Sequence, residues 1–451
     1  MKKAMDTTVK RDFNVSAPGK VILHGEHAVV YGKTALASSL NLRTFLQLRP
    51  TVQASTASFK LLDIGLEWEW NTEELAQTFS ECLGQREAGD AGPPTPVLLA
   101  KMKKFTGVSE DGSTRDLAVL AVLYLYLSVL GSGKASAFPS LEVSVTSELP
   151  TGAGLGSSAA FSVCLSAAFL LQAGITSPVD ENGLNQRSWN KDDLDVINCW
   201  AFEAERIIHG NPSGIDNAVS TYGGALRYQG KAIQPLSKVP NLRILLINTK
   251  IPRSTKVLVA GVRKKYEKFP EVIGPVLESI EGISQMCQSL FEEFMIGPEK
   301  ERGSNPTVVS NQSDSAKQPA DQVAPTVGGT EVQADQTTSL YGQLEDLIDM
   351  NQKFLEILGV SHPSLEALCS LTAKFGLHSK LTGAGGGGCA LTLLRPDTAA
   401  DTVMHVREEV AAVGYDLWET SIGGVGVAFH ADLNRAKEMG FNVPETFLGK
   451  L

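Results

Sequence analysis

The chain has 451 residues, of which 43% are hydrophobic and 20% charged, an ordinary globular composition that excludes wholesale disorder and a small disulfide scaffold. Its 50 acidic and 40 basic residues give a formal net charge of −10, which argues against binding nucleic acid or an anionic membrane through overall charge. The six cysteines lie far apart without a CxxC pair, so their spacing fits neither a zinc site nor a disulfide framework.

No targeting or membrane segment is predicted. The longest apolar run, 117–130, is shorter than the ~20 residues of a membrane span and predicts a buried helix closed by Gly131. The first ten residues are charged and lack the apolar core of a signal peptide, so we expect a cytoplasmic protein. The C-terminal Gly449-Lys-Leu451 resembles the peroxisomal signal Ser-Lys-Leu, with Gly in place of Ser.

Strands and helices are predicted to mix without a regular βαβ repeat. A first strand is expected over 15–23 with a Pro-Gly turn inside it, followed by strands at 36–48, 141–145, 225–228 and 242–247. Helices are expected at 117–130, 158–171, 194–208, 257–269 and 364–375. This pattern predicts an α+β fold with antiparallel pairing, divided near Pro240 into residues 1–240 and 241–451.

One segment differs in composition from the rest. Residues 303–339 contain no Leu, Ile, Phe, Trp or Tyr and are rich in Ser, Thr, Gln, Asp, Pro and Gly. Such a segment buries too little apolar surface to offset its ordering entropy, so it predicts a disordered insertion. Helical periodicity resumes at Leu340, which places the insertion inside a helical hairpin.

A glycine-rich loop carries the strongest chemical signal, in Glu148-Leu-Pro-Thr-Gly-Ala-Gly-Leu-Gly-Ser-Ser-Ala-Ala160. Glycines at this strand-to-helix junction let the backbone approach an anion, and the helix N-terminus presents free amides to it. One of the two serine hydroxyls is a candidate Mg²⁺ ligand. The loop lacks the Gly-Lys-Ser/Thr of a Walker A motif, and tight strand–helix packing remains the alternative. A second cluster, Thr382-Gly-Ala-Gly-Gly-Gly-Gly-Cys389, indicates substrate contact, with a flexible hinge or simple close packing as the alternatives.

Two acidic residues form a further candidate pair. Glu205 lies on the flank of an apolar helical stripe, where a carboxylate needs a cation such as Mg²⁺ or the guanidinium of a nearby Arg. Asp216 ends the turn Gly210-Asn-Pro-Ser-Gly-Ile-Asp216, where a capping role is the alternative.

The segment Ser16-Ala-Pro-Gly-Lys-Val-Ile-Leu-His-Gly-Glu-His27 carries a lysine on an apolar strand. Lys20 needs an anionic partner if it is buried, and the alternative places it at an exposed strand end. His24, Glu26 and His27 do not have the spacing of a zinc motif.

Together these motifs resemble the signature regions of the GHMP kinases, small-molecule kinases that act on galactose, homoserine, mevalonate or phosphomevalonate. The resemblance rests on 16–30, 148–160, 200–224, 248–255 and 378–388, in family order, and covers nearly the whole chain. It implies a two-domain fold, with an N-terminal domain like the second domain of ribosomal protein S5 and a C-terminal ferredoxin-like domain. The residues of segments 16–30 and 211–224 most resemble those of family members that phosphorylate mevalonate, in isoprenoid and sterol biosynthesis. The family resemblance also implies ATP as co-substrate, Mg²⁺ as cofactor and a homodimer.

The resemblance also implies roles for single residues. Asp216 corresponds to the base that takes the proton of the substrate hydroxyl, with Lys20 beside it and the transferred phosphoryl group. Ser158 and Glu205 correspond to the Mg²⁺ ligands, and Glu26, His27 and Thr255 to substrate-side residues. The nucleotide side comprises Lys20, Asp63, Ser147, Gly152, Ala153, Gly154, Leu155, Gly156, Ser157 and Ser158.

Three alternatives remain at this point: a GHMP kinase for another acceptor, a catalytically silent ligand-sensing paralogue, and a mevalonate-diphosphate decarboxylase. A silent paralogue is expected to have lost Asp216, Lys20 or Glu205, and all three are present.

Overall fold

The computed structural model describes residues 11–51, 55–82, 90–109, 112–131, 138–150, 152–178, 186–187, 189–230, 232–236, 239–296 and 328–448. Its strands are β1 (Phe13–His24), β2 (Ala35–Pro50), β3 (Thr56–Leu61), β4 (Leu66–Asn71), β5 (Leu141–Ser147), β6 (Gln186–Arg187), β7 (Ala225–Gln229), β8 (Ala232–Pro235), β9 (Leu242–Asn248), β10 (His378–Leu381), β11 (Cys389–Leu393), β12 (Asp416–Ile422) and β13 (Ala428–His430). In the described residues they form one continuous sheet, ordered β10-β11-β9-β12-β2-β1-β13-β6 along its main path. Antiparallel pairs dominate and β3 runs parallel to β5, so the predicted α+β fold is confirmed.

The helices are α1 (Thr72–Phe79), α2 (Pro96–Thr106), α3 (Thr114–Leu125), α4 (Ser157–Gln172), α5 (Lys191–His209), α6 (Ile215–Tyr222), α7 (Thr255–Lys268), α8 (Pro270–Ile296), α9 (Gly328–Leu358), α10 (Pro363–Ala373), α11 (Ala400–Ala412), α12 (Leu433–Glu438) and α13 (Glu445–Leu448). Short 3-10 turns are η1 (Ala28–Tyr31), η2 (Leu62–Ile64) and η3 (Ser80–Cys82), and the π-helical turn η4 (Tyr126–Leu130) continues α3. None of the described helices combines the length and apolar character needed to cross a membrane.

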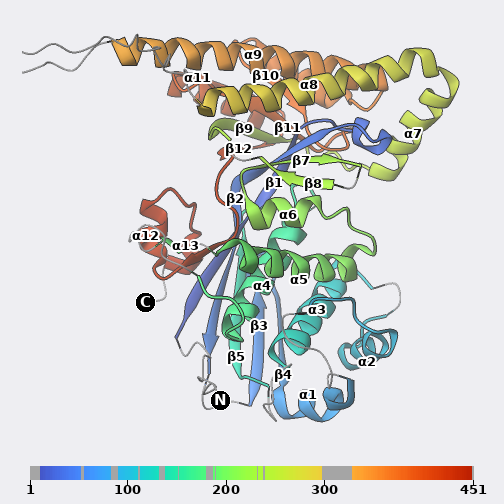
Figure 1. The fold of residues 1–451 in the computed structure, drawn as a ribbon, viewed down its shortest axis with the longest axis vertical. Helices are drawn as coiled ribbons and strands as arrows, with labels where there is room; N and C mark the ends of the chain where they lie inside the picture. The colour runs from blue at the N-terminus through green and yellow to red at the C-terminus, as the bar shows by residue number, and fades with distance from the viewer. Residues whose placement is uncertain are drawn as a thin grey trace, which may run out of the picture.

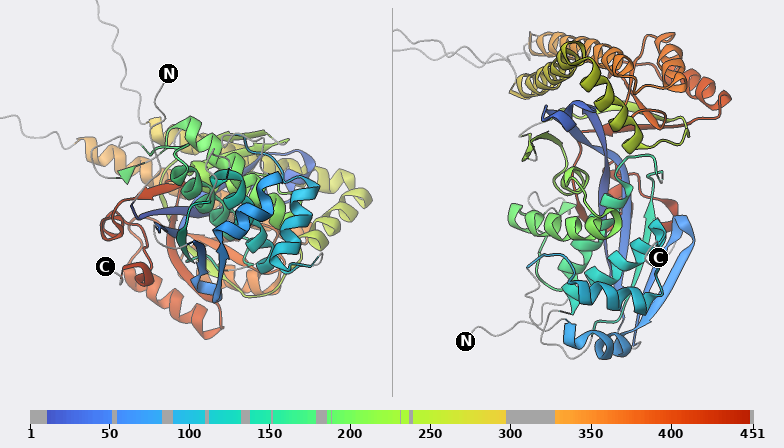
Figure 2. Two further views of the ribbon diagram at one scale, coloured as in Figure 1. Left: turned by 90° about the horizontal axis from the view of Figure 1, so that it is seen from below. Right: turned by 90° about the vertical axis from the view of Figure 1, so that its right-hand side faces the viewer.

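The molecule has two ends joined by its longest strands. Helices α1 to α6 gather around the β1–β5 part of the sheet, and α7 to α11 cover the β9–β12 part (Figure 1). The right-hand view of Figure 2 shows the same division from the side. The predicted division near residue 240 stays a prediction, and the C-terminal segment crosses it: β13 pairs with β1, and Leu433 and Phe441 share a hydrophobic cluster with Phe45 of β2.

The Pro-Gly turn predicted inside the first strand is wrong. β1 is one continuous strand paired with β2, and the register shifts between Pro18 and Gly19. The shift is a local bulge, because long antiparallel pairing outweighs the turn preference of two residues. A side chain at Gly19 would have its Cβ 2.7 Å from the carbonyl oxygen of Leu155, so the bulge lets the glycine-rich loop pack on the strand.

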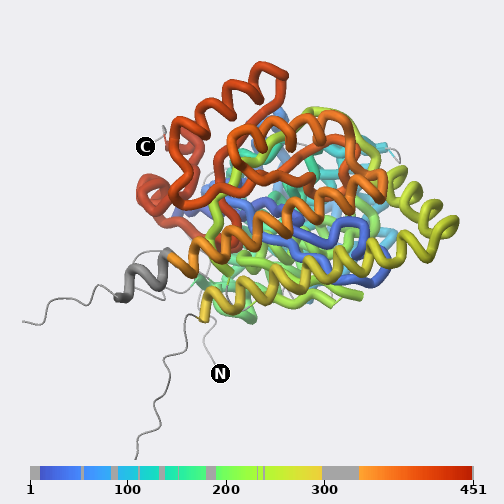
Figure 3. Tube along the Cα trace, turned by 90° about the horizontal axis from the view of Figure 1, so that it is seen from above, coloured from blue at the N-terminus to red at the C-terminus, as the bar shows by residue number. Residues whose placement is uncertain are grey.

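The helical hairpin is present as α8 and α9, which pack against each other (Figure 3). The predicted disordered segment, 303–339, extends too far: α9 begins at Gly328, so its C-terminal part is helical. Extending a helix that already exists costs far less than starting one, and the Glu, Gln and Ala residues just before Leu340 are good helix formers. Residues 303–327 lie outside the described part of the chain.

Candidate active site

The glycine-rich loop leads from β5 into the N-terminus of α4. Gly152, Gly154 and Gly156 have φ angles of 74°, 76° and 75°, a left-handed conformation that favours glycine. The amides of the first turn of α4, beginning with Ser157, have no intrahelical acceptor and lie at the positive end of a 16-residue helix. The loop can therefore hold phosphate oxygens.

Lys20 and Asp216 meet beneath this loop. The ammonium nitrogen of Lys20 lies 3.3 Å from Oδ1 of Asp216, and the two side chains are 11% and 40% exposed. Lys20 sits in the middle of β1, and its amide donates to the carbonyl of Leu155 at 2.8 Å, so the exposed strand end is excluded. A Cβ at Gly156 would lie 3.0 Å from Cγ of Lys20, so glycine allows the loop to cover the pair.

Asp216 reaches this position from the first turn of α6. The residue before that helix, Gly214, has a φ of 83° and turns the chain sharply into it. At the other end of α6 the hydroxyl of Ser220 donates to the carbonyl of Pro18 at 2.7 Å, which ties the helix to β1. Helix and strand thus fix Asp216 relative to Lys20.

Glu205 is buried between α4 and α5 among hydroxyl groups. Ser158 Oγ lies 3.2 Å from its Oε2, and Ser162 Oγ lies 3.1 Å from its Oε1. His209 Nε2 is 3.7 Å from Oε2. No arginine of the described residues pairs with Glu205, and the nearby Arg206 pairs with Glu203, so the predicted alternative of an arginine partner is not seen in that part of the chain. Burial, and secondarily the charge of Asp216, raises the pKa of Glu205 to about 7.

The oxygen donors of Ser158 and Glu205 fit a magnesium ion. Both are hard oxygen ligands beside the phosphate-binding loop, and Mg²⁺ is commonly held by one or two protein oxygens plus substrate phosphates. Among the described residues no Lys or Arg pairs with this buried carboxylate, and a divalent ion would supply the positive charge. In the described residues no cluster of three or more His, Cys, Asp and Glu side chains forms a self-sufficient metal cage.

Asp63 and Ser147 lie together where β5 ends. Asp63 accepts hydrogen bonds from the Thr146 hydroxyl at 2.8 Å and from the Ser147 amide at 2.5 Å. The Ser147 hydroxyl lies 2.8 Å from that of Thr44. These bonds fix the strand end from which the glycine-rich loop starts.

The predicted substrate-side residues have different surroundings. Glu26 is buried, pairs with the ammonium of Lys380 and accepts from Asn351 at 3.1 Å, so both carboxylate oxygens are engaged. His27 has a φ of 60° and its Nε2 lies 2.8 Å from the carbonyl of Ala384 in the second glycine cluster, while burial lowers its pKa. Thr255 begins α7, is exposed, and within the described chain makes no hydrogen bond to these residues.

Arg253 joins the two glycine clusters and was not predicted. Its Nη2 donates to the carbonyl of Ala153 at 2.5 Å. Side chains at Gly154 and Gly388 would overlap its guanidinium, with Cβ atoms only 2.3 and 1.6 Å from its nitrogens. The second cluster also packs closely elsewhere, because a Cβ at Gly385 would lie 2.0 Å from the carbonyl oxygen of Val360. The close packing given as one alternative for this cluster is therefore present, and its contact with substrate stays a prediction.

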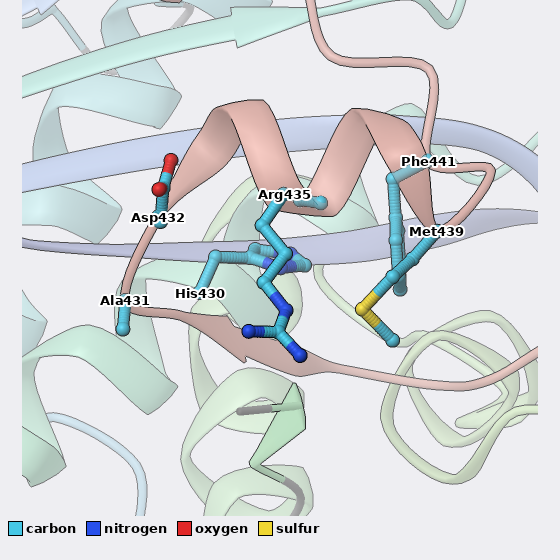
Figure 4. A pocket seen from close by; sticks show the side chains of 7 residues that line it. His430, Ala431, Asp432, Arg435, Met439 and Phe441 are labelled. Carbon is cyan, nitrogen blue, oxygen red and sulfur yellow. The ribbon is translucent and has the colours of Figure 1, made fainter. Parts of the chain in front are cut away.

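Further residues around the site were missed as well, namely Lys380, Asn351 and His209. His209 and Lys380 belong to the motifs that carry the family resemblance, yet residue type and spacing give no sign of their contacts. A pocket beside α12, lined by His430, Asp432 and Arg435 among others, contains none of the predicted site residues (Figure 4).

Known proteins resemble this chain along most of its length. Family models match residues 118–224, as the GHMP kinases N terminal domain, and 338–412, as the GHMP kinases C terminal domain. The mevalonate kinase of Bos taurus is 47% identical over 432 residues, covering 95% of this chain and 98% of that protein. The mevalonate kinase of Arabidopsis thaliana is 34% identical, covering 91% of this chain and 97% of that protein.

A solved structure shares the fold. The crystal structure of the L. major mevalonate kinase in complex with R-mevalonate superposes with a TM-score of 0.57 at 19% identity, covering 94% of this chain and all of that chain.

Proposed function

The chain belongs to the GHMP kinase family and within it to the mevalonate kinases, and we propose that it transfers the γ-phosphoryl group of ATP to the primary hydroxyl of mevalonate at the Lys20–Asp216 pair. The observation that carries this proposal is the position of that pair, 3.3 Å apart beneath a glycine-rich loop at a helix N-terminus. Phosphoryl transfer needs positioning and charge stabilisation more than covalent help, and this geometry offers both.

Each group has a distinct task in the proposed reaction. Asp216 accepts the proton of the substrate hydroxyl, and Lys20 stabilises negative charge on the attacking oxygen and the transferred group. The amides of the Gly152–Ser158 loop hold the phosphates. Ser158 and Glu205 would hold Mg²⁺, which when bound neutralises phosphate charge.

The remaining predicted residues take supporting roles. We keep Asp63 and Ser147 on the nucleotide side, because their hydrogen bonds fix the start of the loop. His27 and Thr255 are kept on the acceptor side, and Glu26 shapes that side through its buried pair with Lys380. A homodimer is proposed from the family resemblance alone, and a cytoplasmic location from the charged first ten residues, which lack the apolar core of a signal peptide.

Acceptor choice is the direct test of the proposed function. In a coupled assay of ADP release, mevalonate should give the highest kcat/KM among mevalonate, phosphomevalonate, galactose and homoserine. A higher kcat/KM for another acceptor would show that the chain is a GHMP kinase for that acceptor instead of mevalonate. ADP release with none of the four would favour the silent ligand-sensing paralogue.

A further inference from the structure

His209 touches both proposed magnesium ligands, although no step of the proposed reaction uses it. It is the last residue of α5, and its Nε2 lies 2.9 Å from Ser158 Oγ and 3.7 Å from Glu205 Oε2. Its side chain is 47% exposed, so burial of the ring does not explain its position.

The hydroxyl proton of Ser158 has two acceptors within reach. In this structure Ser158 Oγ lies 3.2 Å from Glu205 Oε2 and 2.9 Å from His209 Nε2. A serine hydroxyl carries one proton and two lone pairs, so it donates to one of these atoms at a time. Binding of a cation between Ser158 and Glu205 requires this proton to point away from the carboxylate.

Of the two acceptors, His209 is the one that remains once a cation engages the carboxylate. Within the described residues, Glu205 Oε1 accepts from Ser162, and Oε2, the atom nearest Ser158, would face the cation. An imidazole with its proton on Nδ1 presents a free lone pair at Nε2. Partners of this kind orient metal ligands in many proteins.

We propose that His209 is a positioning residue of the magnesium site: its Nε2 accepts the Ser158 hydroxyl proton and so turns the Ser158 oxygen toward a cation shared with Glu205. The inference rests on the proposed function, in which Ser158 and Glu205 are the magnesium ligands. His209 itself does not touch the cation.

Binding of Mn²⁺, a spectroscopic substitute for Mg²⁺, tests this role without turnover. The dissociation constant of Mn²⁺ is measured by electron paramagnetic resonance on the full chain saturated with a non-hydrolysable ATP analogue. His209→Phe keeps a ring but removes the acceptor, and it should weaken Mn²⁺ binding about tenfold or more. His209→Gln keeps an acceptor oxygen and should stay within about threefold of the wild type. His405→Phe, at an exposed position on α11, is the matched control and should change nothing.

The decisive comparison uses Ser158→Ala. Without the hydroxyl there is no proton to accept, so adding His209→Phe to Ser158→Ala should have no further effect, a marked departure from additivity. Three results would overturn the proposal. His209→Phe could bind Mn²⁺ as tightly as the wild type, the effects of Ser158→Ala and His209→Phe on Mn²⁺ affinity could add in the double variant, or the Phe and Gln variants could lose the same affinity. His209→Ala serves as a second acceptor-free variant if thermal unfolding shows that His209→Phe is misfolded.

Failure of the proposed metal ligands has a different signature. If Ser158→Ala and Glu205→Gln both bind Mn²⁺ as the wild type does, the ligand assignment is wrong, and the role of His209 falls with it. If both variants lose affinity while His209→Phe does not, only the inference about His209 is overturned.

Discussion

Glu26 and Glu205 are both buried carboxyl groups, yet their surroundings differ in one respect. Glu26, just after β1, contacts the buried ammonium of Lys380 on β10 and the amide of Asn351 on α9. Glu205, on α5, contacts two serine hydroxyls and the half-exposed His209. In the part of the chain that the structure describes, Glu26 pairs with a lysine, whereas no Lys or Arg pairs with Glu205.

This difference separates a structural charge from a functional one. A buried ion pair whose remaining donors and acceptors are satisfied holds elements in place, and here it ties β1 to the C-terminal part of the sheet. A buried carboxyl group without a cation is kept partly neutral by burial, which raises the pKa of Glu205 to about 7. A divalent cation would stabilise its ionised form, so the Glu205 region is suited to a ligand.

The largest effect is expected at Asp216, beside the Glu205 region. Asp216→Asn keeps the shape of the side chain but removes the proposed proton acceptor and its charge next to Lys20. Turnover should fall by on the order of 10²–10⁴-fold, while affinity for a non-hydrolysable ATP analogue is retained. Steady-state kinetics measures turnover, and titration measures the affinity for the analogue. Turnover equal to that of the wild type would show that Asp216 is not the proton acceptor.

Lys380→Met tests the Glu26 region, where the charge is compensated. It leaves Glu26 buried without a cation and should lower the free energy of unfolding by about 3–5 kcal/mol. Replacing both partners, with Glu26→Gln added, should recover much of the loss. Urea unfolding measures the wild type, the single variant and the double variant. Glu205→Gln is the matched control, because no Lys or Arg of the described residues pairs with that carboxylate. If Glu205→Gln is as destabilised as Lys380→Met, the distinction between the two regions fails.

The sequence predicts which residues gather around Asp216 better than it predicts the partner of Glu26. Lys20, Ser158, Glu205 and Asp216 each stand in a short motif, and the structure brings all four together. Lys380 and Glu26 are 354 residues apart, and residue type alone does not say which buried lysine meets which carboxylate.

Local preferences also mislead where tertiary structure outweighs them. The Pro18-Gly19 pair has the chemistry of a turn, but pairing along β1 and β2 turns it into a bulge. The polar composition before Leu340 suggests disorder, but continuity with α9 makes residues from Gly328 onward helical.

Glu148, at the start of the glycine-rich loop, is another carboxyl group whose pKa is raised by burial, as that of Glu205 is. It accepts from the Arg43 amide at 3.1 Å, whereas the Arg43 guanidinium is engaged by Ser16, Val425 and Gly426, and burial raises the pKa of Glu148 to about 7. A raised carboxyl pKa means that the folded state binds the proton more tightly than the unfolded state does. Its contribution to stability is therefore complete below the unfolded pKa of about 4.5 and is lost as the pH rises to about 7.

Glu148→Gln should remove this part of the pH dependence. Relative to the wild type, the variant should gain about 1–3 kcal/mol between pH 5 and pH 8, as measured by urea unfolding at both values. Glu142→Gln, at an exposed position on β5, is the control and should show a constant difference from the wild type. A constant difference for Glu148→Gln as well would mean that Glu148 ionises normally in the folded protein.

The smallest effect is expected for a segment whose composition offers little apolar surface to bury. Deleting residues 304–327 removes a segment without large aromatic or Leu and Ile side chains and leaves α8 and α9 whole. These helices pack against each other, and their consecutive ends lie at the same end of the hairpin (Figure 3), so the seven remaining residues 297–303 need only join them. Each halving of a loop changes its closure free energy by only ~0.6 kcal/mol, so thermal stability and kcat should stay close to the wild-type values. Extending the deletion to Thr338 removes the first turns of α9 and provides the internal comparison, because a loss seen only there belongs to the helix. A loss of activity already in the shorter deletion would instead assign residues 304–327 a part in the active site or its closure.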